Sequence, residues 1–198
     1  MKQPPQLILL DSNAYLRLAI SIHPLLGQKF GQDKEENYVI RVIEKLDQEY
    51  AKNQRLRYKF HWVKDPSYVE NRTLERLRIP PKQQKEVDLA VSFILGEEKR
   101  SEFSLSLVDA QALAVGFVKQ CPVVSDDRGV QEIGGLLEIE VWSTLQLLKL
   151  MMNEQAINLD KCLEIAAYLD SENDLPCGRR EFALEFKKFF GITPFTEK

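Results

Sequence analysis

The sequence has few of the residues that mark several common protein classes. It contains three cysteines, none in a C-x-x-C pair, which argues against a disulfide framework and a zinc knuckle. It has no G-x-G-x-x-G motif, which disfavours a dinucleotide-binding enzyme. The apolar run at 7–10 is far shorter than the roughly 20 residues that span a bilayer, and no basic leader precedes it. We therefore expect a cytoplasmic protein without a membrane partner.

Composition indicates an ordinary globular chain with an uneven charge distribution. The 198 residues are 44% hydrophobic and 29% charged, and the net charge is -3. Residues 52–85 carry ten Lys or Arg against three acids, so this segment is strongly basic although the chain is acidic. A basic segment attracts phosphates, and Lys52, Arg55, Arg57 and Lys59 are candidate nucleic-acid contacts. The alternative is a solvated basic face.

Hydrophobic periodicity predicts strands that alternate with helices. We expect strands at 7–10, 57–63, 122–124 and 139–142, and helices over 34–50, after Pro81, from Ser106 and after Ser143. Residues 126–129 are expected to form a turn. Such alternation indicates an α/β fold with a mainly parallel sheet. Beyond residue 152 the pattern is helical only, so we predict a domain over 1–152 and a C-terminal helical extension over 153–198.

Carboxylates stand where the predicted strands end. Asp11 follows the first strand, Asp126 and Asp127 follow the strand at 122–124, and Asp109 opens the helix that leads to it. Ligands of parallel sheets collect at the carboxyl ends of strands, so these acids could share one pocket. Converging carboxylates need a cation, for which Mg²⁺ or Mn²⁺ is the natural choice, and such a centre can hydrolyse phosphodiesters.

Three motifs resemble, in their order, the signatures of PIN-domain nucleases, which include VapC-type toxins. They are Leu-Ile-Leu-Leu-Asp11-Ser-Asn13, Asp109-Ala-Gln-Ala-Leu-Ala and Val-Val-Ser125-Asp-Asp127-Arg, and the match covers about residues 5 to 150. The resemblance implies a three-layer α/β/α fold and a Mg²⁺- or Mn²⁺-dependent endoribonuclease. It assigns the acids as Asp11, Glu44, Asp109 and Asp127, with the first, third and fourth as metal ligands, and Asn13, Ser125 and Asp126 in support.

Two features depart from compact members of that family. The stretch between Glu44 and Asp109 is longer, so Glu86 and Asp88 are rivals of Glu44 as the middle acid, and the helical tail lies outside the usual domain. The resemblance also implies an RNA substrate, an antitoxin protein as inhibitor, and a homodimer.

Simpler interpretations stay open for each feature. Asp11 and Asp109 could be helix-capping residues, and Asp127 could belong to a turn. Tyr58, Phe60 and Trp62 could stack bases or belong to the core. The alternative function is a non-catalytic PIN-like module that binds RNA or a protein.

Overall fold

The structure is a computed structural model that describes residues 5–31, 37–98 and 104–195. Its strands are β1 (Gln6–Leu10), β2 (Lys29–Phe30), β3 (Tyr38–Ile43), β4 (Arg76–Leu77), β5 (Val123–Val124) and β6 (Val141–Trp142). Its helices are α1 (Ser12–Leu18), α2 (Lys45–Lys52), α3 (Gln54–Lys59), the 3-10 helix η1 (His61–Lys64), α4 (Pro66–Glu75), α5 (Pro81–Glu98), α6 (Leu107–Lys119), α7 (Arg128–Leu136), α8 (Thr144–Asn153), α9 (Leu159–Ser171) and α10 (Arg179–Phe190).

The strands form one mainly parallel sheet with β1 at its centre. The order is β2-β3-β1-β5-β6, and β4 also pairs with β3. Within the described chain, only β2 runs antiparallel to its neighbour. Leu10 is in register with Val42 of β3 and with Val124 of β5. The carboxyl ends of these three strands therefore lie at one edge of the sheet.

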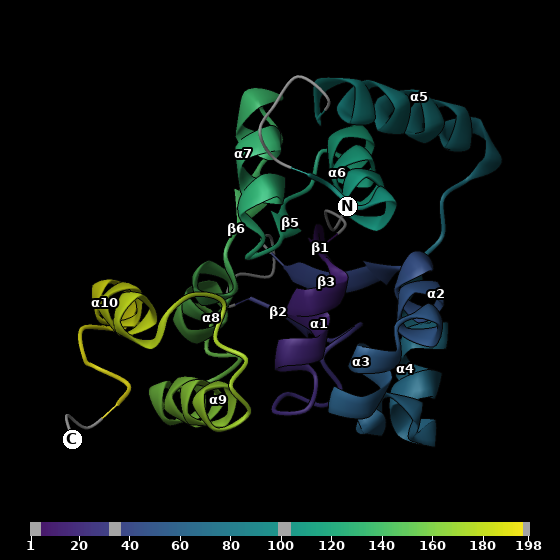
Figure 1. The fold of residues 1–198 in the computed structure, drawn as a ribbon. Coiled ribbons are helices and arrows are strands. Elements are labelled where there is room, and N and C mark those ends of the chain that lie inside the picture. Colours follow the sequence, from purple (N-terminus) through teal and green to yellow (C-terminus); the bar gives the residue numbers. More distant parts are fainter. Residues whose placement is uncertain (1–4, 32–36, 99–103, 196–198) are drawn as a thin grey trace.

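Helices cover both faces of the sheet (Figure 1). Side chains of a strand alternate between faces. Ile8 and Leu10 accordingly belong to a hydrophobic cluster that includes side chains of α1, α8, α9 and α10, whereas Leu9 belongs to a second cluster with side chains of α5, α6 and α7. The prediction of an α/β fold with a mainly parallel sheet is confirmed, and the layout is compatible with three layers.

Helix caps follow the sequence closely. Ser106 and Ser143 each form a reciprocal capping box, and Gly191 ends α10 in the left-handed conformation. On α6, a side chain at Gly116 would collide with Val123 of β5, so the small residues of this helix allow its close approach to the sheet. These local signals explain why α6 and α8 form where they were predicted and why α10 ends at Gly191.

The C-terminal helices share a hydrophobic cluster with the start of the chain. Cys162 and Ile165 of α9, and Phe182 and Phe186 of α10, belong to the cluster that contains Tyr15 of α1. Burying each such side chain contributes about 1.5–3 kcal/mol. The division at residue 152 stays a prediction, but buried apolar contacts cross it.

Three local predictions were wrong. Residues 38–43 form a strand instead of a helix, because this strand is rich in Val and Ile that are buried on both faces, and their spacing also suits a helix. The residues 34–36 that were to open this helix lie outside the described chain. Residues 57–63 form α3 and η1 instead of a strand, because the Asn53 side chain caps the N-H groups of Arg55 and Leu56. The turn at 126–129 runs directly into α7.

Among the described residues, no helix is both long enough and apolar enough to cross a bilayer.

Candidate functional site

The acidic residues gather where the order of the parallel strands reverses. The chain passes from β1 to β3 on one side and later to β5 on the other, and open α/β sheets bind ligands at such a switch point. The Asp11 N-H donates to the carbonyl of Val124 at 3.0 Å, so the residues that follow β1 and β5 are directly linked. We call Asp11, Asp109, Asp126 and Asp127 the acidic site.

Asp11 is the most unusual member of the acidic site. Its side chain is the N-cap of α1, where Oδ1 accepts from the Ala14 N-H at 2.6 Å. The residue is only 3% exposed, and its Oδ2 has no hydrogen-bond partner among the described residues. Burial raises the Asp11 pKa to about 7, and the charges of Asp126 and Asp109 add to this effect. Nearby Ser125 and the Ala14 N-H favour the ionised form and limit the rise. Capping therefore accounts for one carboxylate oxygen and leaves the other without a role.

Asp109 and Asp127 each use one oxygen to cap a helix. Asp109 Oδ2 accepts from the Ser106 N-H at 3.1 Å, and Asp127 Oδ1 accepts from the Val130 N-H at 3.0 Å. Burial raises the pKa of Asp109, and the charge of Asp127 raises it further. These two carboxylates are therefore close enough to repel each other across the start of α6 and α7.

Asp126 is held by cationic and hydroxyl partners instead. Its Oδ2 pairs with Arg17 at 2.9 Å and also accepts from the Thr144 hydroxyl, while Oδ1 accepts from the Thr144 N-H at 2.8 Å. Arg17 also contacts Asp174, which pairs with Lys59 at 2.6 Å. Asp126 thus anchors the start of α8 and a chain of ion pairs, which gives it a structural task beside its predicted supporting one.

Glu44 stands at the same edge of the sheet but is turned to a cation. It follows β3, precedes α2, and its Oε1 accepts from Arg76 at 3.0 Å. Its side chain is 63% exposed. Its two rivals lie on α5. The Asp88 carboxylate accepts a hydrogen bond from Gln84. Glu86 lines a hollow together with residues 138–140, which precede β6 and so lie at the edge of the sheet opposite to the acidic site. Glu44 is therefore the better placed of the three.

The supporting residues differ in burial. Ser125 is fully buried and its hydroxyl accepts from the Asp127 N-H at 3.2 Å, whereas Asn13 is exposed on α1. The neighbouring Ser12 was not predicted, yet its hydroxyl is buried and has no partner among the described residues. Only its adjacency to Asp11 could have indicated it from the sequence.

The negative charge of the acidic site suits a cation, but its carboxylates do not converge on one point. Among the described residues, no three His, Cys, Asp or Glu side chains stand close enough to hold a metal ion. An ion shared by Asp11, Asp109 and Asp127 therefore requires these side chains to turn toward each other. The buried, unpartnered Oδ2 of Asp11 favours such an ion, and so does the pKa of Asp11, which is raised by burial and further by the charges of Asp126 and Asp109.

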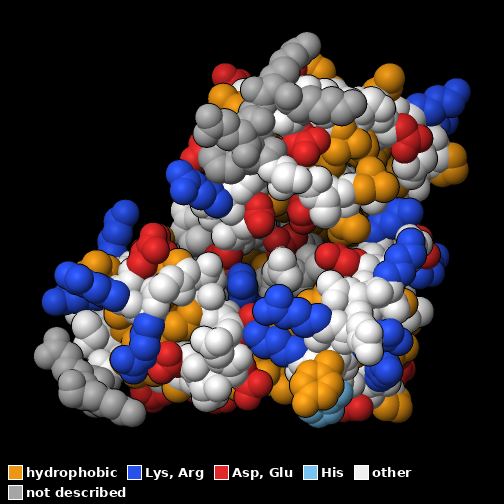
Figure 2. Space-filling model, in the orientation of Figure 1, with side chains coloured by type: hydrophobic (Ala, Val, Ile, Leu, Met, Phe, Trp, Pro, Cys, Tyr) orange, Lys and Arg blue, Asp and Glu red, His pale blue; other side chains and the backbone are white. Residues whose placement is uncertain are grey.

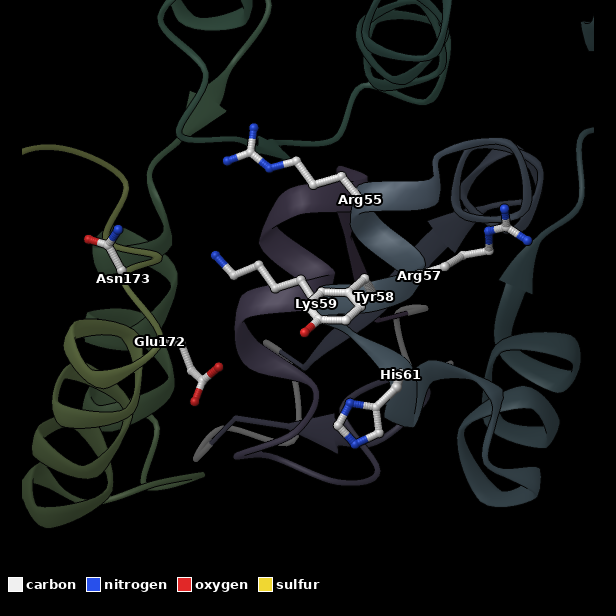
Figure 3. Close-up of a pocket in the computed structure, with 7 residues that line it drawn as sticks. All are labelled: Arg55, Arg57, Tyr58, Lys59, His61, Glu172 and Asn173. Atoms are coloured by element: carbon white, nitrogen blue, oxygen red, sulfur yellow. The ribbon is translucent and has the colours of Figure 1, made fainter.

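The predicted phosphate contacts lie on α2 and α3. Arg55, Arg57 and Lys59 line an open hollow of about 790 Å³, in which Arg55 and Lys59 extend toward Asn173 and Arg57 points away (Figure 3). Lys52 and Arg55 line a second hollow that reaches residues 106–108 at the start of α6. The basic residues therefore extend to the turn of α6 that carries Asp109.

Of the three aromatic candidates, only one is available to a ligand. Tyr58 is 88% exposed beside the basic residues, whereas Phe60 and Trp62 are buried in the hydrophobic core. Figure 2 shows acidic side chains in a central depression, with Lys and Arg side chains around it. The surface thus combines an acidic centre with a basic surround.

No family model, curated protein or solved structure matches this chain.

Proposed function

We propose that this chain is a divalent-metal-dependent endoribonuclease whose centre is the acidic site. The observation that carries the proposal is the buried, unpartnered Oδ2 of Asp11 beside Asp109 and Asp126, at the switch point of a parallel sheet. A helix cap needs one carboxylate oxygen. A second oxygen that is buried, unpartnered and subject to repulsion is costly unless a cation approaches it.

Asp11, Asp109 and Asp127 are the residues that would hold Mg²⁺ or Mn²⁺. When bound, such an ion neutralises charge on the phosphate and lowers the pKa of water for phosphodiester hydrolysis. The Ala14 N-H fixes Oδ1 of Asp11, and Ser125 orients the turn that carries Asp127. Arg17 occupies the neighbouring Asp126 in an ion pair. Glu44 joins the site only when Arg76 releases it.

The basic residues supply substrate affinity. Lys52, Arg55 and Arg57 are exposed, and none forms an ion pair within the described residues, so they are available to RNA phosphates. Lys59 is partly engaged by Asp174 and contributes less. Tyr58 offers an exposed ring for stacking on an unpaired base.

The test is cleavage of end-labelled RNA by the full chain in Mg²⁺ or Mn²⁺, with and without chelator. We expect Asp11→Asn to lose cleavage, because it removes a metal-binding charge but keeps the helix cap. Asp160→Asn, an exposed acid on α9, is the matched control and should cleave normally. Equal cleavage by wild type and Asp11→Asn would contradict the proposal and reveal a contaminating nuclease.

A second candidate is a non-catalytic module that binds RNA. It is favoured by the exposed Arg55 and Arg57 at the hollow beside α3 and by Glu44, which is exposed and paired with Arg76. This function predicts RNA binding that is unchanged by Asp11→Asn and no cleavage in any metal. Filter binding beside the cleavage test separates the two.

We further propose that the chain acts as a toxin held by an antitoxin, and that it forms a homodimer. Exposed Leu89 and Phe93 on α5 support a protein partner, since large apolar side chains on one helix mark contact surfaces. Growth arrest on expression, relieved by Asp11→Asn, would support the toxin role, and harmless expression of active enzyme would contradict it. Sedimentation velocity tests the dimer.

A further inference from the structure

A cavity of about 300 Å³ lies between β4, α2, α5 and α6. It opens at the carboxyl ends of β3 and β4, next to the edge that holds the acidic site. Part of its wall is aliphatic and consists of Ile43, Leu77, Ile79, Val87 and Val115, and the remaining lining residues are polar or charged. A cavity of this size that joins an apolar wall to polar groups suits a small ligand.

One buried polar atom of the cavity lining lacks a partner. Gln111, on α6 two residues after Asp109, lines the cavity, and its Oε1 is buried without a hydrogen bond among the described residues. A buried acceptor without a donor is unfavourable in the free protein. A ligand that donates a hydrogen bond from its edge while its flat faces contact aliphatic walls would relieve this cost.

Cationic side chains stand at the same cavity. Lys45, Arg76 and Arg78 line it, and Glu44, which pairs with Arg76, is its one acid. Lys45 and Arg78 form no ion pair within the described part of the chain. They are therefore available to a phosphate attached to the ligand.

The cavity is continuous with the basic surface. Lys45 and Gln111 also line the hollow that contains Lys52, Arg55 and residues 106–108. A polynucleotide that follows these cations therefore passes the start of α6, where Asp109 lies, and reaches the cavity.

From this geometry we infer that the cavity binds one nucleotide of the substrate, with its base between the aliphatic walls and its phosphate on Lys45 and Arg78. Gln111 Oε1 accepts from the exocyclic amino group of the base. Adenine, cytosine and guanine are therefore preferred over uracil, whose N3–H donor is flanked by two carbonyl oxygens that repel Oε1. Gln111 is thus a specificity-determining residue. This inference rests on the proposed function and adds a base-recognition site to it.

The experiment titrates the full chain with each nucleoside 5′-monophosphate and with inorganic phosphate, in chelator, by saturation-transfer NMR. We expect the amino-bearing nucleotides to bind roughly threefold to tenfold more tightly than uridine monophosphate, the range of one hydrogen bond. Gln111→Leu should abolish this preference. Arg78→Ala should weaken the binding of all four nucleotides alike, because contacts to the phosphate carry no information about the base.

Gln28→Leu, at an exposed position before β2, is the matched control and should leave binding unchanged. Circular dichroism and thermal melting check that Gln111→Leu folds. Equal affinity for the four nucleotides, a preference for uridine monophosphate, or no binding at millimolar concentration would each overturn the inference. Because the titration contains no metal and no phosphodiester bond, its result is independent of the cleavage test.

Discussion

The two halves of the carboxyl edge of the sheet handle charge in opposite ways. Beyond β1 and β5, Asp11 is buried and Asp109 is partly buried, and the pKa values of both are raised by burial and by neighbouring acids. Beyond β3 and β4, the cations stand at accessible hollows, and Arg78 is exposed. Repulsion among buried acids is unfavourable in the free protein, whereas exposed cations are solvated at little cost. The acidic half is therefore suited to a bound ion and the basic half to a mobile polyanion.

Asp126 shows that burial alone does not make an acid reactive. It lies directly beside the other acids, yet Arg17 and Thr144 satisfy both of its oxygens. Asp11 is more deeply buried than Asp126 and has only one oxygen satisfied. The difference between these two residues defines which carboxylate is left to bind a cation.

The largest expected effect is the pH dependence of folding stability that Asp11 causes. In the folded chain this residue keeps its proton up to about pH 7, while the unfolded chain releases it near the ordinary value of 3.8. The folded state binds more protons between these values, so stability falls as pH rises through this window. Each pKa unit is worth about 1.4 kcal/mol, so Asp11→Asn should be more stable than wild type at pH 8, without metal, by up to about 4 kcal/mol.

Urea denaturation in chelator at pH 5 and pH 8 measures this difference. The gain in stability of the variant over wild type should be about 1.6 kcal/mol at pH 5 and about 4 kcal/mol at pH 8. A gain that is the same at both values would show that Asp11 ionises normally.

The next effect concerns the ion pair that satisfies Asp126. Arg17→Met leaves this carboxylate, only 7% exposed, without its cation, and should cost about 2–3 kcal/mol. Lys161→Met, which breaks the exposed pair with Glu164, is the control and should cost at most about 1 kcal/mol. Chemical denaturation compares them, and equal losses would mean that Asp126 needs no partner.

A smaller effect is expected for the basic half. Replacing Arg55 and Arg57 together by Ala should weaken RNA binding uniformly across sequences, because phosphate contacts carry no sequence information. The slope of log K against the logarithm of salt concentration should become less steep by about 1.4, because each phosphate contact on a single strand contributes roughly 0.7. Binding measured from 50 to 200 mM salt tests this expectation. An unchanged slope would place the RNA elsewhere.

The smallest effect should come from Glu44, the acid of the basic half. Its pair with Arg76 is exposed, so Glu44→Gln should change stability by less than about 1 kcal/mol. Cleavage should fall by less than about tenfold, far less than for Asp11→Asn. A loss as complete as that of Asp11→Asn would make Glu44 a full member of the metal centre.

Local signals in the sequence were sufficient for much of the fold and for the location of the acids. The caps at Asp11, Ser106 and Ser143 are read from neighbouring residues, and strand ends place Asp11 and Asp127 at one edge. Residues 38–43 failed because a doubly buried strand and a helix share their hydrophobic spacing.

Partners far apart in the chain could not be predicted. Arg17 and Asp126 are 109 positions apart, and Lys59 and Asp174 are 115 apart, so no local pattern links them. The unpartnered oxygen of Gln111 likewise depends on how α5, α6 and β4 pack together. Such long-range contacts decide whether a carboxylate oxygen has a hydrogen-bond or ion-pair partner.

Direct titration of the full chain with Mn²⁺ at pH 8, followed by the electron paramagnetic resonance signal of free Mn²⁺, tests the acidic site most directly. The wild type and Asp160→Asn should bind Mn²⁺ saturably and release it to excess Mg²⁺, whereas Asp11→Asn should lose this binding. Equal Mn²⁺ affinity in Asp11→Asn and wild type would contradict the assignment of the buried carboxylate as a metal ligand.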